Sequence, residues 1–439
     1  MSTTRDGSAS STPTNVRWLV LGVTTLTSFM LYLDRACMAT ILSADSFKSE
    51  ITLTPAQDAD IKSWFFWAYA LCQVPAGFLA DKFGARGIMA FYVIAWSTCT
   101  LLGGFANGFV GLAAARVGLA IVQAGAYPTS VGLLGNWIPF QIRGVASSIV
   151  ATGGRFGGAS APLLTAWLVV GWGWREALIL YGIVGIAIGI LFYVYFRTSP
   201  ERHPKCNQAE CDLITDGRPP AELRARSMRS PMPWGPLVKS FGMWMNCLVQ
   251  FATNVGWAFI ISDLPKYLRE VHKLSDIEAG GISTFAFLCG IPGMLFGGWL
   301  TDYATRKLGL RWGRAVPTAA ARFVAMLAYV ACLFLDDPYL IAGAIGLMAF
   351  ATDLGVGGIW AYTQDVGGRY AGSMLGWGNM WGNFGAALQP KIVQKLLHDH
   401  GNIEGWNYIF IVFIIAFAIS SVAALALDGT KPVVPKSQE

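Results

Sequence analysis

The chain has 439 residues, of which 54% are hydrophobic and only 13% are charged. Soluble domains carry about 25% charged residues and cover most of their exterior with polar side chains. This composition therefore excludes a soluble globular protein and indicates an integral membrane protein surrounded by the lipid bilayer. The net charge of +6 does not indicate a nucleic-acid partner, because the basic residues gather in particular loops.

Twelve apolar runs predict the membrane-spanning helices. Residues 1–16 are polar, and no short apolar region with a cleavage site precedes the first run, so we expect no cleaved signal peptide. Runs of about 20 apolar residues predict transmembrane helices. They lie at residues 17–42, 58–80, 86–106, 109–136, 143–170, 176–197, 241–267, 277–301, 315–335, 338–365, 371–396 and 405–427. We therefore predict an all-α integral membrane protein with twelve transmembrane helices.

One long polar stretch divides these runs into two sets of six. We expect an N-terminal six-helix bundle over residues 1–197, a linker loop over 198–240 and a C-terminal six-helix bundle over 241–439. The linker is rich in lysine and arginine, and the loops on its side carry more base than the opposite loops. The positive-inside rule then places both termini and the linker in the cytoplasm.

A short motif occurs once in each half, at the end of the second predicted helix. Its glycine and aspartate are Gly77 and Asp81 in the first half, and Gly298 and Asp302 in the second. Basic residues follow each copy, namely Lys82 and Arg86, then Arg306 and Lys307. The glycine allows close helix packing and the aspartate can cap a helix or pair with base; a solvated turn is the alternative. Two such repeats predict a transporter whose halves rock about a central site.

The first predicted helix contains an acid and a base, Asp34 and Arg35, within an apolar run. A charge near the middle of a membrane costs roughly 2.5–3.5 kcal/mol on insertion scales, so both residues need an explanation. Helical neighbours point about 100° apart, and the two side chains therefore face different surroundings. Either they form structural contacts with another helix or a headgroup, or Arg35 binds an anionic substrate while Asp34 holds a neighbouring helix or carries a proton.

Several segments carry a resemblance to a known family. GFLADKFGAR at residues 77–86 resembles the loop signature of the major facilitator superfamily. Within it the chain is similar, nearly end to end, to the anion:cation symporter family, which moves sugar acids, hexuronates and other organic anions. The segments are YLDR at 32–35, FFWAYALCQVPAG at 65–77, QAGAYP at 123–128, GWGWREA at 171–177, SPERHP at 199–204, DLPKYL at 263–268, DVGGRYAGSMLGWGN at 365–379 and GNFG at 382–385.

The resemblance implies a substrate site between the two halves. It makes Arg35 a ligand for the substrate carboxylate, which suits the planar fork of arginine, and Tyr69 a hydrogen-bond donor. Trp360 would cover the sugar-like part, unless it is a lipid-facing or core aromatic residue. Asn379 and Asn383 are four residues apart on one helix face and would bind hydroxyls; hydrogen bonding between helices is the alternative.

Four further residues concern charge coupling. Arg116 matches a family position that usually partners acids, and Asp34 is its expected mate in a structural or gating pair. Gln123 stands where proton-coupled members have a glutamate, and an amide cannot bind and release a proton. Asp34 would then carry the proton alone, or Asp353 in the tenth run would substitute. Otherwise the protein is a uniporter or an exchanger.

Arg155 lies in a run of small residues, TGGRFGGASAP, which leaves little room beside it. Together with Arg35 it would hold a dicarboxylate or strengthen the field for a monocarboxylate. The alternative is a helix-interface arginine bonded to main-chain carbonyls.

The chain thus reads as a transporter of a small organic anion, coupled to H⁺ through Asp34. We expect it in a bacterial inner membrane, as a monomer. The sequence contains no histidine cluster, catalytic triad or phosphate-binding glycine loop, so we predict no enzyme activity, no metal and no cofactor. The rival hypotheses are a uniporter or anion exchanger of the same fold, an anion sensor that does not transport, and an intramembrane enzyme.

Overall fold

The computed structural model describes residues 12–83, 85–139, 142–197, 199–215, 234–367 and 370–433. These residues form helices and connecting turns, with no β-strand among them, which confirms the predicted all-α class. In chain order the first half contains α1 (Val16–Ser43), α2 (Asp45–Glu50), α3 (Pro55–Phe83), α4 (Ala85–Gly104), α5 (Phe109–Gln123), α6 (Ala126–Trp137), α7 (Arg143–Gly171) and α8 (Trp174–Tyr195). Helices suit a membrane because they satisfy every main-chain polar group within one segment.

The linker and the second half follow in the same way. The linker contains the short helices η2 (Pro200–Arg202), α9 (Gln208–Thr215) and α11 (Trp234–Lys239). The second half contains α12 (Phe241–Ser262), α13 (Leu264–His272), α14 (Asp276–Cys332), α15 (Pro338–Leu354), α16 (Val356–Gly367), α17 (Ala371–His400) and α18 (Asn402–Ala424). Polar caps begin three of them: Ser240 at α12, the Ser275 capping box at α14 and Asp337 at α15.

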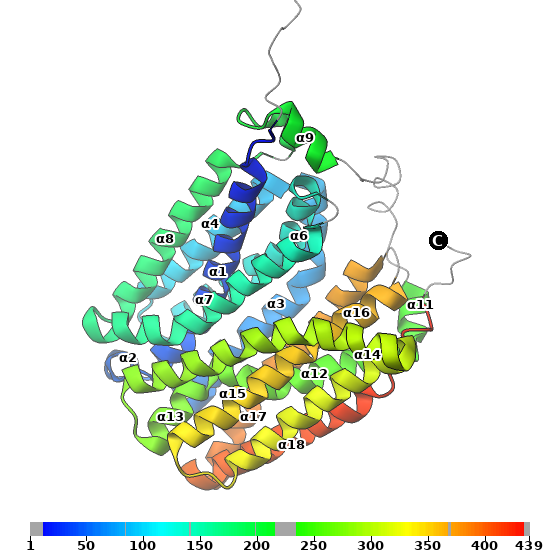
Figure 1. Cartoon of the computed structure of the whole chain (residues 1–439). Helices are drawn as coiled ribbons and strands as arrows, with labels where there is room; N and C mark the ends of the chain where they lie inside the picture. The colour runs from blue at the N-terminus through cyan, green and yellow to red at the C-terminus, as the bar shows by residue number, and fades with distance from the viewer. Residues whose placement is uncertain are drawn as a thin grey trace, which may run out of the picture.

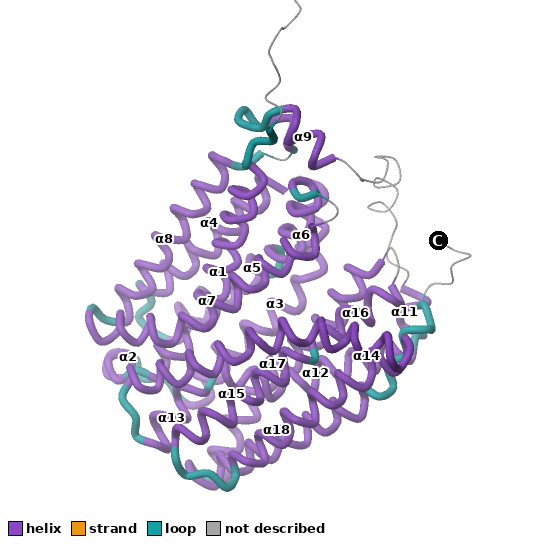
Figure 2. The backbone as a smooth tube through the Cα atoms, viewed as in Figure 1, coloured by secondary structure: helices purple, strands orange, loops and turns teal. Residues whose placement is uncertain are grey.

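The helices are grouped in two bundles (Figure 1; Figure 2). Helices α1 and α3–α8 form one bundle, and α12–α18 form the other. Across the boundary α3 packs against α17, and α7 packs against α14. The hydroxyl of Ser63 donates to the carbonyl of Ala387 at 2.6 Å, and the Trp67 and Phe384 rings lie 4.9 Å apart between centroids.

Within each bundle, equivalent pairs of helices cross at a glycine. A methyl group at Gly157 of α7 would lie 2.0 Å from the carbonyl oxygen of Phe29 in α1, and one at Gly385 of α17 would lie 2.1 Å from that of Phe251 in α12. These are the first and fifth long helices of each half, so the same close crossing occurs twice. The repeated crossing supports the internal repeat seen in the sequence.

One predicted span is bent, two have a local irregularity and two are merged. The run 241–267 extends into α12 and α13 with a 62° bend. The run 109–136 is α5 followed by α6, and 338–365 is α15 followed by α16, but the joining residues Ala124, Gly125 and Gly355 keep right-handed helical backbone angles. Conversely, 277–301 and 315–335 lie in α14, which kinks at Gly309 (φ 77°). A left-handed backbone of this kind is readily adopted only by glycine among common residues.

Six helices in the described ranges are long and apolar enough on their own to cross a membrane, or seven if the bent pair α12–α13 counts as one span. Among the other long helices, α3 and α17 face each other across the boundary between the bundles, and α7 faces α14. Helices in this position carry polar residues toward protein rather than lipid, which lowers their mean hydropathy.

The linker is fastened to the start of α1. Glu210 of α9 is fully buried and accepts hydrogen bonds from the main-chain N–H groups of Val16 and Arg17 at 3.2 and 3.0 Å, and from the Arg17 guanidinium at 3.0 Å. The Thr14 hydroxyl also donates to it. Burial acts to raise the pKa of Glu210, but these hydrogen bonds outweigh it and hold the pKa below its usual range. The carboxylate therefore caps α1 from the linker.

The glycine crossing of α1 and α7 gives a first prediction. Gly157→Ala should lower the stability of the purified protein by about 1–3 kcal/mol, because the methyl group would overlap the Phe29 carbonyl. Gly22→Ala, in α1, is the matched control, since a methyl group there meets nothing within 4 Å. Thermal unfolding in detergent measures both variants. Equal melting temperatures for the two would contradict the close crossing.

Candidate functional site

Arg35 is a buried cation enclosed by aromatic rings. It lies in the middle of α1, where its side chain is 6% exposed. Its Cζ atom lies 4.5 Å from the centroid of the Tyr69 ring, 5.1 Å from that of Tyr32 and 5.4 Å from that of Phe65. Among the described residues its Nε and Nη2 atoms have no hydrogen-bond partner, and no carboxylate forms an ion pair with it. A guanidinium with free N–H groups can bind an anion, and the Tyr69 ring lies against it; the role of Tyr69 as a hydrogen-bond donor to the substrate stays a prediction.

Arg116 contacts α1 in a different way from the one expected. Its Nη1 and Nη2 atoms donate to the main-chain carbonyls of Asp34 and Arg35, at 3.1 and 3.3 Å. Both carboxylate oxygens of Asp34, which is 1% exposed, have no hydrogen-bond partner among the described residues. The expected ion pair between Arg116 and the Asp34 carboxylate is thus not formed. The fork of the guanidinium spans two successive carbonyls, while the carboxylate of Asp34 lies beside Trp96 and Thr100 of α4.

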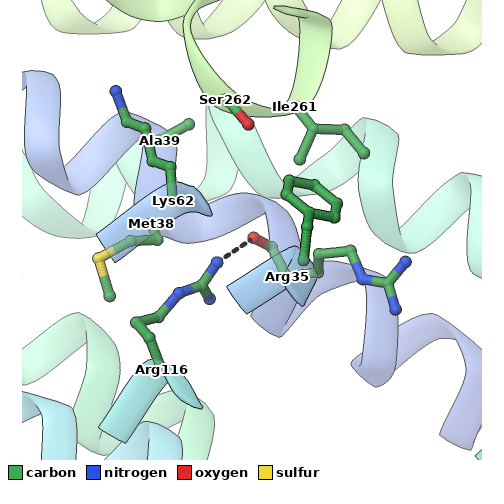
Figure 3. Close-up of a pocket in the computed structure, with 8 residues that line it drawn as sticks. Arg35, Met38, Ala39, Lys62, Arg116, Ile261 and Ser262 are labelled. Carbon is green, nitrogen blue, oxygen red and sulfur yellow. Dashed lines mark hydrogen bonds between the residues drawn. The ribbon is translucent and has the colours of Figure 1, made fainter. Parts of the chain in front are cut away.

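A small cavity lies between Arg35, Lys62 and Arg116 (Figure 3). Its volume of about 10 Å³ matches a single water molecule. The remaining walls are Met38, Ala39, Phe66, Ile261 and Ser262, so both halves of the chain contribute. In Figure 3 the guanidinium of Arg116 points to the carbonyl beneath Arg35, while the Arg35 and Lys62 side chains extend to opposite sides. The three cations therefore serve three different environments.

Lys62 forms a buried junction between the halves. Its Nζ atom lies 2.7 Å from the carboxylate of Asp263 in the second half and 2.8 Å from that of Asp58 one turn earlier in α3. Gln389 of α17 donates to the other oxygen of Asp263 at 3.0 Å. This junction was not predicted from the sequence. The signal available was the position of both charges inside predicted apolar runs.

Other ion pairs between the halves lie at the same end of the bundle. They join Lys391 to Asp60 at 2.5 Å, Arg269 to Asp45 at 2.6 Å and Lys48 to Glu270 at 3.9 Å. These residues lie at the end opposite the linker, where α1 ends and α3 begins. In the ranges that the structure describes, no ion pair joins the halves at the linker end. The bundle is therefore held closed at the end away from the linker.

Arg155 and Asp353 form the ion pair between the halves nearest the middle of the bundle. The Nη2 atom of Arg155, in α7, lies 2.5 Å from the Oδ1 atom of Asp353, in α15. Arg322 of α14 also lies near Asp353 and donates to the Thr352 carbonyl at 2.6 Å. The Trp257 ring centroid lies 5.4 Å from the Cζ atom of Arg155. Both residues were expected to act separately, and the structure brings them together.

The fourth predicted span of each half has one irregular point, and each point lies close to a buried polar side chain of the site. The point between α5 and α6 follows Gln123, and the point between α15 and α16 comes at Gly355, two residues after Asp353. Gln123 is fully buried and donates from Nε2 to the Leu31 carbonyl at 3.2 Å. These irregular points lie in corresponding positions of the two halves and agree with the internal repeat.

The remaining predicted ligands come from α16 and α17. Asn383 donates to the main-chain carbonyl of Asn379, at 2.8 Å, so the two residues lie one helical turn apart on one face. Trp360 is 43% exposed. A row of amides on α12, formed by Asn246, Gln250 and Asn254, packs against glycines of α17, which the sequence analysis missed. Their spacing of four residues within an apolar run was the available signal.

The repeated glycine and aspartate motif is only partly described. The surroundings of Gly77 and the side chains of Asp81 and Lys82, all in α3, lie outside what the structure describes. Arg86 donates to the Tyr193 carbonyl at 2.7 and 3.0 Å. In the second copy a methyl group at Gly298 would meet nothing within 4 Å, and Asp302 lies 3.6 Å from Arg314, which also pairs with Asp365 at 2.7 Å.

Two repeated helical bundles with buried cations between them are typical of membrane transporters. The sequence profile of the Major Facilitator Superfamily matches residues 24–390. The chain therefore belongs to this superfamily, as the loop signature indicated.

Similar proteins are named as transporters of organic acids. The probable sulfoacetate transporter SauU of Cupriavidus necator is 28% identical over 413 residues, which cover 93% of each chain. The probable galactarate/D-glucarate transporter GudP of Bacillus subtilis is 28% identical over 456 residues, 98% of this chain and 97% of its own. The D-galactonate transporter of Escherichia coli is 27% identical over 92% of this chain and 94% of its own. The predicted class, a transporter rather than an enzyme, is thereby confirmed.

A solved structure shows the same fold. The bacterial homolog to the human lysosomal transporter Spinster, in an inward-facing and unoccupied conformation, aligns with a TM-score of 0.74 at 19% identity. The alignment covers 94% of this chain and 97% of that chain. The predicted major facilitator fold is therefore confirmed.

The junction at Lys62 gives a second prediction. Asp263→Asn should weaken the closure at that end, because the Lys62 amine would lose one of its two carboxylate partners. Ser262 lies beside it, is 4% exposed and can report the opening as a cysteine. In a background without native cysteines, we expect Ser262→Cys to react several-fold faster with a membrane-impermeant maleimide when Asp263→Asn is added. Asp302→Asn, at the other end, is the control, and equal rates in both would exclude a closing role for Asp263.

Proposed function

We propose that the chain is a secondary active transporter of a small organic anion, such as a sugar acid, a hexuronate or a related carboxylate. The observation that carries this proposal is Arg35, a buried cation with unpartnered N–H groups and no carboxylate partner in the described residues. A guanidinium in this state suits a carboxylate or sulfonate, which accepts two parallel hydrogen bonds. The named cargoes of the relatives, sulfoacetate, galactarate, D-glucarate and D-galactonate, are all acids and support the same class.

Alternating access is the mechanism that the arrangement of contacts supports. Ion pairs between the halves gather at the end away from the linker, and these must break for that end to open. By the positive-inside rule we assign the linker end to the cytoplasm, and on that assignment this is an inward-facing state. We further propose that the protein acts as a monomer in a bacterial inner membrane. In this scheme the substrate binds Arg35 near Tyr69, with Trp360, Asn379 and Asn383 on the opposite half.

For coupling, we propose that Asp34 carries the proton. It is buried, and both its carboxylate oxygens have no hydrogen-bond partner in the described part of the chain. Gln123 keeps its amide proton on the Leu31 carbonyl and cannot titrate. Asp353 is ion-paired with Arg155 and is therefore less suited to the role. A uniporter or exchanger would need no titrating group, and a sensor would bind the anion without moving it.

The anion site gives a third prediction. Arg35→Gln should raise the Kd of any acid that the wild type binds about 30-fold or more, since losing one partner of a buried charge pair costs about 2–5 kcal/mol. The measurement is a thermal-shift screen of sugar acids, hexuronates, aromatic acids and dicarboxylates on purified protein. Arg202→Gln, in the exposed linker, is the control. Stabilisation by neutral or cationic solutes alone would overturn the anion assignment.

Proton coupling gives a fourth prediction. Asp34→Asn should abolish accumulation of the anion driven by an inward pH gradient, while counterflow of labelled against unlabelled anion persists, because an amide cannot release a proton. Both are measured in proteoliposomes. Gradient-driven accumulation that survives in the variant would show that Asp34 is not the proton carrier. Binding without counterflow in the wild type would instead favour the sensor.

A further inference from the structure

The middle of the bundle contains more buried cations than buried acids. Four buried or part-buried arginines lie there, each on a different helix, together with two aspartates; they are Arg35, Arg116, Arg155, Arg322, Asp34 and Asp353. With both aspartates ionised, these six side chains carry a net charge of +2. Uncompensated charge in a buried site is costly, and a bound dianion would neutralise both charges at once. A monoanion would neutralise only one.

The two arginines nearest the boundary face the same pair of tyrosines. Arg35 lies over the Tyr32 ring, 5.1 Å from its centroid, and Arg155 lies close to both Tyr32 and Tyr127. The Tyr32 and Tyr127 ring centroids are 6.3 Å apart. The two guanidinium groups thus lie beside the same pair of tyrosines. Two cations beside one pair of rings favour a ligand with two acidic groups over a ligand with one.

Asp353 fits closely in its present place. A methyl group at Gly290 of α14 would lie 2.3 Å from its Oδ2 atom, so the carboxylate rests directly on this glycine. Its Oδ1 atom contacts Arg155 across the boundary. One carboxylate oxygen is therefore held by the second half while the other reaches into the first half. Asp353 therefore occupies, at Arg155, the position that a substrate carboxylate would take.

Arg322 gives Asp353 a second cation. It lies next to Asp353, and its Nε atom has no hydrogen-bond partner in the described ranges. Its guanidinium packs on Gly355, where a methyl group would lie 3.0 Å from Cζ. When Arg155 leaves Asp353, the carboxylate keeps an arginine neighbour in its own half. The exchange of partners therefore leaves no isolated buried acid, which would be costly.

We propose that Arg155 binds the second acidic group of a dianionic substrate whose first acidic group binds Arg35, and that Asp353 takes the same place at Arg155 whenever the substrate leaves. The inference rests on the proposed function, because it requires Arg35 as the first ligand. Binding of a dianion then breaks the Arg155–Asp353 contact between the halves. A monoanion bound at Arg35 leaves this contact intact. Arg155 is thus a specificity-determining residue, and Asp353 is its internal competitor.

The test compares matched acids on the purified full-length protein. D-Glucarate and D-gluconate share a six-carbon polyol chain and differ by one carboxylate, and sulfoacetate and acetate differ by a sulfonate. Isothermal titration gives the Kd of each acid. For whichever pair binds, we expect the Kd of the dianion to be about tenfold lower than that of the monoanion, a ratio within the usual range of coupling between two sites. The double variant Arg155→Gln/Asp353→Asn removes both charges together, leaves neither stranded, and should abolish this preference.

Single variants separate the two roles. Asp353→Asn should tighten binding of the dianion by roughly fivefold or more, because the competitor is removed, and should leave the monoanion little changed. Arg155→Gln should weaken only the dianion, and Arg202→Gln should change neither. A dianion Kd that is the same in the wild type and the double variant, or a monoanion that binds as tightly as its dianion, overturns the inference. If Arg35→Gln still abolishes that binding, the proposed function stands, whereas no binding by any acid to the wild type overturns both.

Discussion

The structure depends on how it stabilises positive charge inside an apolar helical bundle. Arg35 has aromatic faces around it, Arg116 has two main-chain carbonyls, and Arg155 shares the carboxylate of Asp353 with Arg322. Cation–π contacts and carbonyls lower the cost of a buried guanidinium without neutralising it. The three solutions leave different capacities for a ligand. Arg116 is occupied by the backbone, Arg155 must exchange a partner, and Arg35 has N–H groups available.

Contacts within the halves differ in kind from contacts between them. Inside each half, helices cross where glycine brings two backbones together, as at Gly157 and Gly385, and such packing cannot adjust without overlap. Many of the contacts between the halves are ion pairs of flexible side chains, such as Lys62 with Asp263 and Lys391 with Asp60. Water can replace the partners of these side chains when the halves separate. The chemistry of the contacts thus favours rigid halves with a boundary that can open.

The sequence was sufficient for the elements whose signals are local. Apolar runs predicted the helices, and the charges in the first run made Arg35 a candidate ligand. The local irregularities after Gln123 and at Gly355 were not predicted, because a glycine in an apolar run fits a regular membrane helix equally well. Contacts between residues distant in sequence could not be predicted either. Arg155 and Asp353 are 198 residues apart and Lys62 and Asp263 are 201 apart, so only the packing of the halves brings them together. The same limit explains Arg116, whose partner is a backbone that no pattern of side chains reveals.

Gln123 has a consequence for how this chain can change over time. Its amide donates to the Leu31 carbonyl, and a protonated glutamic acid of nearly the same shape can donate to the same oxygen. Glutamine and glutamate codons differ only in their first base. A single point mutation would therefore add a second titratable group beside α1 while the surrounding packing stays as it is. One nucleotide change thus alters the number of titratable groups in the core of this transporter. The capacity for proton coupling can therefore change in evolution while the fold stays the same.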